Sequence, residues 1–266
     1  ETYRRKYLLI LFLFFLWTFL FTLYYGIFLT VLLGVWNLIW FLSERKHFSL
    51  KNVFNWCLTV FLVWLVMLPM LLVYKQVADQ LGVERTLENQ VQYTGPAWSW
   101  IVPTDENWLW RKTINILPKN LNGYAVENFI FPGMLASILF LLAMFYRRFP
   151  KWLSSLKWTA FSLFVFAFGP FLLGLRWKIP MPFTALWTFF YPIRGTRNPH
   201  RLAVFVILCL AFLAAFLLNR LIRKKRVPVI LQIALVAFLI LEFVTVEETK
   251  RAIGKSTPLV YRHLDK

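Results

Sequence analysis

The chain has 266 residues, of which 59% are hydrophobic, 19% aromatic and only 16% charged, and its mean hydropathy is +0.61. A soluble domain of this size is ordinarily about half apolar with about a quarter of its residues charged, so the composition predicts an all-α polytopic membrane protein. The net charge of +18 would suggest nucleic acid in a soluble protein. Here Lys and Arg flank the apolar runs, as topology determinants do, and we expect no nucleic-acid partner.

The apolar runs predict about seven transmembrane helices, since a helix needs about 20 apolar residues to cross the hydrocarbon core. The run 7–42 is too long for one span and fits two short ones, with Gly26 offering the turn between them. Gly169 and Pro170 predict a kink in the fifth span. The predicted spans are 7–22, 25–42, 53–74, 128–146, 158–175, 201–219 and 228–246.

Two longer segments separate these spans. Residues 75–127 form a polar outer loop, in which 83–93 has the periodicity of a short helix. Residues 176–200 are apolar but broken by four prolines, and the stretch 181–191 is too short to span. We therefore predict an interfacial or re-entrant segment at 176–200.

The sequence begins with Glu1 rather than Met and ends without a closing element, which leads us to expect a piece of a longer polypeptide. On this interpretation 1–250 is a fragment of a transmembrane domain, and 251–266 is the truncated start of an extracytoplasmic C-terminal region.

The distribution of Lys and Arg indicates how the chain is oriented in the membrane. With residues 1–6 in the cytoplasm, the short inside segments also include 43–52, 147–157 and 220–227, and together they carry half of the 30 Lys and Arg residues. The other half is spread over much longer stretches. The positive-inside rule therefore places the loop 75–127, the segment 176–200 and the C-terminus outside.

The stretch RGTRNPHR, residues 194–201, then carries arginines on the side where topology does not require them. Asn198 is a good N-cap and Pro199 a good first helical residue, so a helix is predicted to begin there. Arg201 would lie in its first turn, where the helix dipole disfavours a cation by about 0.3–1 kcal/mol unless an anion is present. This arrangement suits a phosphate.

Arg194 and Arg197 precede this helix start and would complete the anion site. The alternative is that they reach to lipid headgroups at the interface. His200 is adjacent and is included among the candidate phosphate-binding residues, although a single histidine near an interface is more often a packing or hydrogen-bonding residue.

The outer loop supplies further candidates. Its tryptophans could stack on sugar rings, but tryptophan is also the standard residue of a membrane interface, and we prefer that interpretation. Asp105 and Glu106 lie among them and could serve a metal or a base, without diagnostic spacing. Near the outer end of the last span, Glu242 is an intramembrane acid and hence a candidate functional residue.

Five stretches, taken in order, carry a resemblance to a known group of proteins: FTLYYGIFLT, LPMLLVYKQVADQLGVERTLENQVQYTGPAWSWIVP, VENFIFPGMLASILFLL, FGPFLLGLRWKIPMPFTALWTFFYPIRGTRNPHRLAVF and STPLVYRHLDK. No single stretch is specific, and their order is the stronger signal. In these features the chain resembles the bacterial integral-membrane proteins of the GT-C glycosyltransferase superfamily, in particular the YfhO-like and mannosyltransferase-like members.

The resemblance implies an enzyme of the cytoplasmic (inner) membrane that transfers a sugar from a polyprenyl-phosphate donor to an acceptor at the outer face. Arg197, Pro199 and Arg201 match an Arg-x-Pro-x-Arg motif that would hold the lipid phosphate, and Arg85 and Glu88 match a motif that would order the outer loop or contact substrate. The catalytic acid would lie upstream. Sugar, acceptor and cofactor stay unassigned, with a divalent cation as one candidate and no metal ligand named.

Two other functions are weighed against the enzyme. A non-enzymatic protein of the same fold would be a lipid-linked glycan transporter or an assembly scaffold. A channel or proton-coupled transporter is poorly supported, because a proton relay needs a chain of ionisable residues and the predicted spans offer little besides Glu242.

Overall fold

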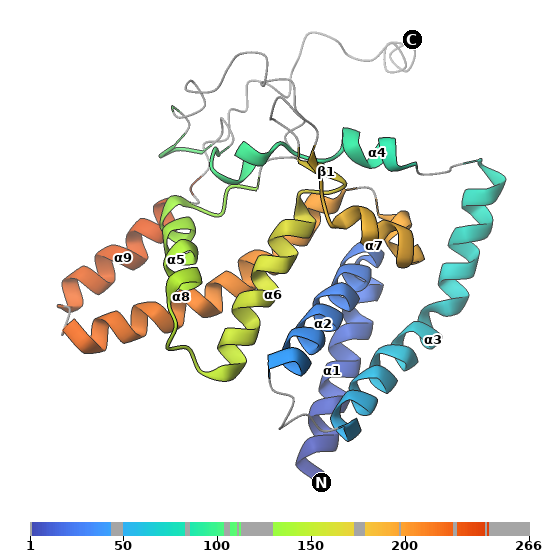
Figure 1. Ribbon diagram of the computed structural model, residues 1–266, viewed down its shortest axis with the longest axis horizontal. Helices are drawn as coiled ribbons and strands as arrows, with labels where there is room; N and C mark the ends of the chain where they lie inside the picture. Colours follow the sequence, from blue (N-terminus) through green and yellow to red (C-terminus); the bar gives the residue numbers. More distant parts are fainter. Residues whose placement is uncertain are drawn as a thin grey trace, which may run out of the picture.

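The computed structural model describes residues 2–43, 50–82, 86–103, 107–110, 112, 130–172, 179–196, 198–225, 228–242 and 244. Within these ranges the protein is mostly helical, and its longer helices run between two ends of one bundle (Figure 1). Three helical stretches are long and apolar enough to cross a membrane: Leu23–Ser43, Val53–Gln80 and Pro199–Arg220. These candidate spans indicate a membrane protein. Shorter apolar helices lie at Lys6–Phe21, Met134–Phe145 and Val229–Glu242.

The first two helices form the predicted hairpin, but Gly26 is not its turn. Helix α1 (Thr2–Phe21) and helix α2 (Leu23–Ser43) meet at Thr22, and Gly26 lies inside α2. A Cβ atom on Gly26 would lie 2.2 Å from Cγ of Phe19. The expectation of a turn at Gly26 is therefore wrong, and this glycine instead lets the Phe19 ring pack directly on the α2 backbone.

Helix α3 (Leu50–Gln80) packs against α1 and continues six residues beyond the predicted span, so the beginning of the expected outer loop is helical. Trp64 of α3 packs edge-on against Phe19, with ring centroids 5.1 Å apart, and its Nε1 donates to Oγ1 of Thr30 at 3.2 Å. After α3, the short helix α4 (Leu87–Gln92) and a 3-10 turn, η2 (Ala97–Trp100), belong to the predicted outer loop. Residues 83–85 of the predicted short helix lie outside the described residues.

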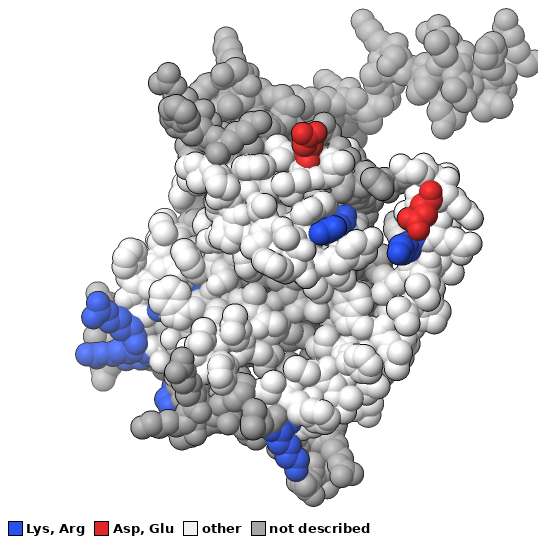
Figure 2. Space-filling view, turned by 45° about the vertical axis from the view of Figure 1, so that its right-hand side comes forward, with Lys and Arg blue, Asp and Glu red and all other residues white. Residues whose placement is uncertain are grey.

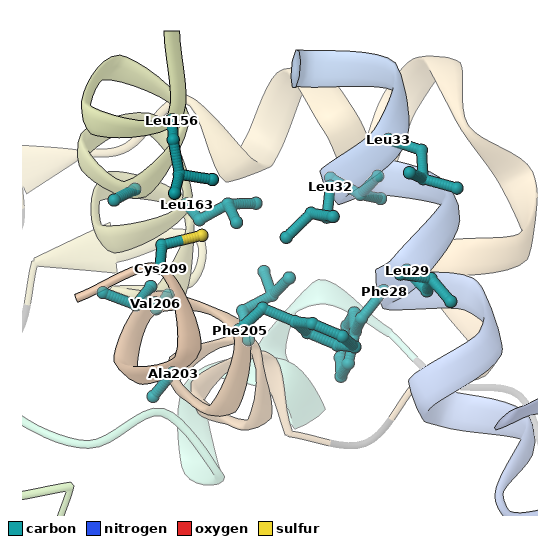
Figure 3. Close-up of a cluster of buried hydrophobic side chains, with 14 of the residues drawn as sticks. Phe28, Leu29, Leu32, Leu33, Leu156, Leu163, Ala203, Phe205, Val206 and Cys209 are labelled. Carbon is teal, nitrogen blue, oxygen red and sulfur yellow. The ribbon is translucent and has the colours of Figure 1, made fainter. Parts of the chain in front are cut away.

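The second half of the bundle consists of α5 (Met134–Phe145), α6 (Lys151–Ala167), α8 (Ala203–Lys225) and α9 (Val229–Glu242). Helix α6 packs against both α2 and α8, and α5 packs against α8. Figure 3 shows the apolar side chains that α2, α6 and α8 direct toward one another, including Leu32, Leu163 and Val206. The core thus lies where these three helices meet.

The fifth predicted span, 158–175, is wrong in position. Helix α6 begins at Lys151 and ends at Ala167, because Gly169 adopts a φ of +71° that an α-helix cannot continue. The expected kink is thus the end of the helix. Beyond it, β1 (Phe171–Leu172) pairs with β2 (Ile179–Pro180) in an antiparallel ladder.

The segment between β2 and α8 contains only short helices, which agrees with the prediction that it is too short to span. These are α7 (Phe183–Phe189) and the 3-10 turns η6 (Tyr191–Gly195) and η7 (Pro199–Leu202), the last of which leads directly into α8. Since α7 has seven residues, its length is about 10 Å, a third of the hydrocarbon core.

We call the end of the bundle that holds the start of α1, the α5–α6 connection and the end of α8 the basal end, and the opposite end, with Thr22, α4, α7 and η7, the apical end (Figure 1). In Figure 2 the lower middle of the visible face is uncharged, and the acidic side chains lie toward the apical end, where basic side chains are also seen. The described parts of the predicted inside segments thus lie at one end, and the described parts of 75–127 and 176–200 at the other.

Candidate functional site at the apical end

The helix predicted at Asn198 and Pro199 begins there. The Asn198 side chain is 2% exposed, and its Oδ1 accepts a hydrogen bond from the His200 backbone N–H at 2.9 Å. The carbonyl oxygen of Asn198 accepts from the Arg201 N–H at 3.3 Å. Two of the N–H groups expected to be open to an anion are thus bonded to Asn198 itself, so an anion would depend mainly on side-chain donors.

Arg201 is half-buried and lies on the α1–α2 hairpin. Its guanidinium carbon is 5.3 Å from the centre of the Tyr24 ring, within the range of a cation–π interaction. The neighbouring Tyr25 ring packs edge-on against Phe205 of α8 at 6.2 Å. The start of α8 is therefore fixed against the start of α2, and Arg201 is held at that junction.

Arg194 has a structural role that the sequence did not suggest. Its Nε donates to the carbonyl oxygen of Trp187 at 3.1 Å, and its Nη2 donates to that of Thr188 at 3.4 Å. Its guanidinium also lies 5.3 Å from the Tyr191 ring centre. Because the last carbonyls of a helix carry a partial negative charge, Arg194 stabilises the C-terminus of α7. Arg197 lies outside the described residues.

His200 faces the interior of the bundle. Its side chain is 2% exposed, and Nδ1 lies 2.6 Å from the carbonyl oxygen of Ala167 at the end of α6. This bond joins the start of α8 to the end of α6 and gives His200 the hydrogen-bonding role that was the alternative to phosphate contact.

A buried polar cluster, consisting of Gln90, Thr94 and Thr196, connects the outer loop to the residues that precede this helix start. Gln90 Nε2 donates to the carbonyl oxygen of Thr196, and Thr94 Oγ1 donates to that of Gln90 at 2.7 Å. A Cβ on Gly169 would lie 2.5 Å from Thr94 Oγ1 and 3.3 Å from Pro199 Cγ. Sequence reasoning missed Gln90 and Thr94, although their i, i+4 spacing was a signal for one shared helix face.

The other outer-loop candidates do not join this cluster in the described part of the chain. Glu88 is exposed in the first turn of α4, where an acid is favourable to the helix dipole. Arg85, Asp105 and Glu106 lie outside the described residues.

The tryptophans of the outer loop differ in their surroundings. Trp100 is 6% exposed, and its ring lies 4.7 Å from Phe164 and 6.2 Å from Phe168, centre to centre. Trp108 is 49% exposed. Trp100 is therefore a core residue that attaches η2 to α6, and the interface interpretation is wrong for it.

Glu242 is buried and caps another helix. Its side chain is 1% exposed, and Oε1 accepts from the Met134 N–H at 2.7 Å and from Trp110 Nε1 at 3.1 Å, while Oε2 accepts from the Leu135 N–H at 3.2 Å. A carboxylate at a helix N-terminus is favoured both by the open N–H groups and by the dipole. The acid at the end of α9 therefore stabilises the start of α5.

The opposite end of α5 receives a cation. Lys157 of α6 is 6% exposed, and its Nζ lies 3.4 Å from the carbonyl oxygens of Met144 and Tyr146. Helix α5 is thus bounded by a carboxylate at its N-terminus and an ammonium at its C-terminus, the order that its dipole favours. Sequence reasoning assigned Lys157 only to a basic loop, and its position within α6 is what brings it to α5.

Among the residues described here, no three His, Cys, Asp or Glu side chains gather closely enough to hold a metal ion. Comparison with known proteins adds no relative: no protein-family profile, curated protein or solved structure matches the chain.

Proposed function

We propose that the chain is part of a GT-C-like membrane glycosyltransferase, which transfers a sugar from a polyprenyl-phosphate donor to an acceptor at the outer face of the bacterial cytoplasmic membrane. In this proposal the apical end faces outside and Arg201 contacts the donor phosphate. The observation that carries it is the position of Arg201, which Tyr24 holds at the first turn of the helical stretch Pro199–Arg220.

The physical argument rests on the helix dipole. At the start of a helix the partial positive charge of the N-terminus repels a cation. A bound phosphate would make the position of Arg201 favourable, because its negative charge attracts both and it accepts charge-assisted hydrogen bonds from the guanidinium. Because Asn198 already bonds the N–H groups of His200 and Arg201, the guanidinium carries most of the contact. Arg194 bonds to carbonyl oxygens of α7 and His200 to that of Ala167, so the proposal keeps Arg201, which Tyr24 holds at the helix start, and its sequence neighbour Arg197.

The proposed topology has seven spans with the basal end in the cytoplasm. Basic residues at the basal connections, among them Arg147 and Arg148, support this orientation through the positive-inside rule. Helix α5 has only 12 residues, about 18 Å, and its capped ends allow it to terminate inside the protein rather than in lipid.

A non-enzymatic transporter or scaffold of the same fold is the second candidate, and the described acids favour it. Glu242 is bonded to the start of α5, while Asp79 and Glu88 are exposed. The described part of the chain therefore supplies no buried carboxylate for a catalytic base, and the enzyme needs an acid from another part of the protein.

The test measures photo-crosslinking of a polyprenyl-phosphate analogue to the full-length protein in proteoliposomes. We expect Arg201→Ala to lower the affinity by about tenfold or more, the loss of one or two charge-assisted hydrogen bonds. Arg220→Ala is the matched control, because Arg220 lies on the same helix with its guanidinium 5.3 Å from the Tyr146 ring centre. Equal affinity in wild type and Arg201→Ala would contradict the phosphate assignment. Binding without sugar transfer by the full-length protein would favour the transporter or scaffold.

A further inference from the structure

A groove of about 430 Å³ lies between α1 and α3, at the basal end of the bundle and far from Arg201 along the helices. Five residues of α1 line it: Tyr7, Leu8, Ile10, Leu11 and Phe14. All except Leu8 follow an i, i+3, i+4, i+7 spacing and so share one face of the helix. The groove therefore runs along α1 for about two turns.

The opposite wall comes from the beginning of α3, where Asn55 and Trp56 line the groove. Both side chains are half-buried. On the α1 side, Ile10 is 50% exposed and Phe14 is 61% exposed, although both are large and apolar. The groove is thus open and mainly apolar, with one amide in its wall. It lies on a helix pair that contains a candidate span.

Two lysines lie within about one helical turn of the lining residues, one on each helix. Lys6 directly precedes Tyr7, and Lys51 lies four residues, about one turn, before Asn55. Both lysine side chains are exposed. An apolar groove whose lining includes a phenol and an amide, with a lysine within about one turn on each helix, is complementary to a molecule with an acyl chain and an anionic headgroup.

We infer that this groove binds one anionic diacyl phospholipid of the cytoplasmic leaflet. The acyl chain lies along Ile10, Leu11 and Phe14, and the headgroup phosphate lies between Lys6 and Lys51. This site is separate from the proposed donor site, since it lies at the other end of the bundle and uses none of the apical residues. It rests on the orientation proposed above, with the basal end in the cytoplasm, but not on the transferase activity.

Native mass spectrometry of the full chain in a zwitterionic detergent tests the inference, with phosphatidylglycerol and phosphatidylcholine as probes. We expect one tightly bound phosphatidylglycerol and weaker binding of phosphatidylcholine. Each lysine near the headgroup contributes about fivefold in affinity, so Lys6→Ala with Lys51→Ala should weaken phosphatidylglycerol binding by more than about tenfold. The double variant Arg147→Ala with Arg148→Ala removes two exposed cations from the same end, outside the groove. It should change the affinity for phosphatidylglycerol by less than about twofold.

A second pair of variants tests the groove itself. Leu11→Trp should obstruct the groove and reduce binding of both lipids, whereas Leu13→Trp, on the opposite side of α1 and 54% exposed, should not. Equal affinity for the two lipids, or equal losses in the two double charge variants, would overturn the inference. So would a dimer in which a second chain excludes the lipid, or displacement of phosphatidylglycerol by polyprenyl phosphate.

Discussion

In the helical stretch Pro199–Arg220, which comprises η7 and most of α8, an arginine stacks on a tyrosine ring near each end. Arg201 lies 5.3 Å from the Tyr24 ring centre at the start of the helix, and Arg220 lies 5.3 Å from the Tyr146 ring centre near its end. The dipole favours a cation at the C-terminus and opposes one at the N-terminus. Arg201 lies where the dipole opposes a cation, whereas Arg220 lies toward the end of the helix that favours one, and this contrast supports the function that we propose for Arg201.

The two ends of the bundle also differ in how their polar side chains are placed. At the apical end, polar side chains are buried and bonded across elements that are distant in sequence, as Gln90 with Thr196 and Glu242 with α5. At the basal end, Arg147, Arg148 and Arg220 are exposed. Buried polar contacts are not confined to the apical end, since Lys157 is 6% exposed and lies 3.4 Å from two carbonyl oxygens at the C-terminus of α5. In the proposed orientation the exposed basal arginines face the cytoplasm.

The largest expected effect comes from removing the buried carboxylate. Glu242→Ala would leave two backbone N–H groups of α5 and Trp110 Nε1 without their acceptor, and we expect a loss of about 3 kcal/mol in the free energy of unfolding. Glu242→Gln keeps one acceptor oxygen and should lose about half as much. Thermal unfolding in detergent measures both.

Arg148→Ala, at the basal end, is the control for the two Glu242 variants. Its side chain is exposed, so the change should stay within about 0.5 kcal/mol. A Glu242→Ala variant as stable as Arg148→Ala would show that the apical hydrogen bonds do not distinguish the two ends.

A smaller effect is expected at the end of α6. Gly169→Ala places a side chain at a φ of +71° and 2.5 Å from Thr94 Oγ1, so it should lower the free energy of unfolding by about 1–3 kcal/mol. Gly195→Ala, at the same end of the bundle, meets no atom within 4 Å and should be nearly neutral. If the two alanine variants unfold at the same temperature, the close packing of the outer loop on α6 and η7 is not important for stability.

The smallest effect concerns the two arginines themselves. Arg220→Ala loses a cation–π contact and a favourable dipole interaction, which should cost about 0.5–1 kcal/mol. Arg201→Ala loses a similar contact but relieves an unfavourable dipole interaction, so its stability should change less. Urea or thermal unfolding of the two variants provides the comparison, and a larger loss for Arg201→Ala would remove the electrostatic reason for assigning it a function.

The sequence predicted the features that depend on local chemistry. Asn198 and Pro199 begin a helix as expected, and the first apolar run folds into a hairpin. Apolar runs do not mark helix ends, however, so the span at 158–175 was misplaced, and Lys157 was assigned to a loop although it lies within α6. Gly26 was assigned to a turn because its packing partner, Phe19, belongs to another helix.

The roles of the candidate site residues depended even more on distant partners. Glu242 bonds to Met134, 108 residues earlier, and Gln90 to Thr196, 106 residues later. Only the folded chain brings such groups together, and a single sequence carries no signal for them. This is why the sequence grouped Arg194 and His200 with Arg201, whereas the fold bonds Arg194 to α7 and His200 to the end of α6.

The most direct test of the account is the side of the membrane on which the apical end lies. Gly195 is exposed at that end and Arg148 at the basal end, so Gly195→Cys and Arg148→Cys are introduced with Cys57→Ser, which removes an exposed thiol. An impermeant maleimide added to intact cells, after the outer membrane is permeabilised, should label position 195 but should label position 148 only after the inner membrane is opened. Labelling of position 148 alone in intact cells would contradict the orientation and the phosphate site at Arg201.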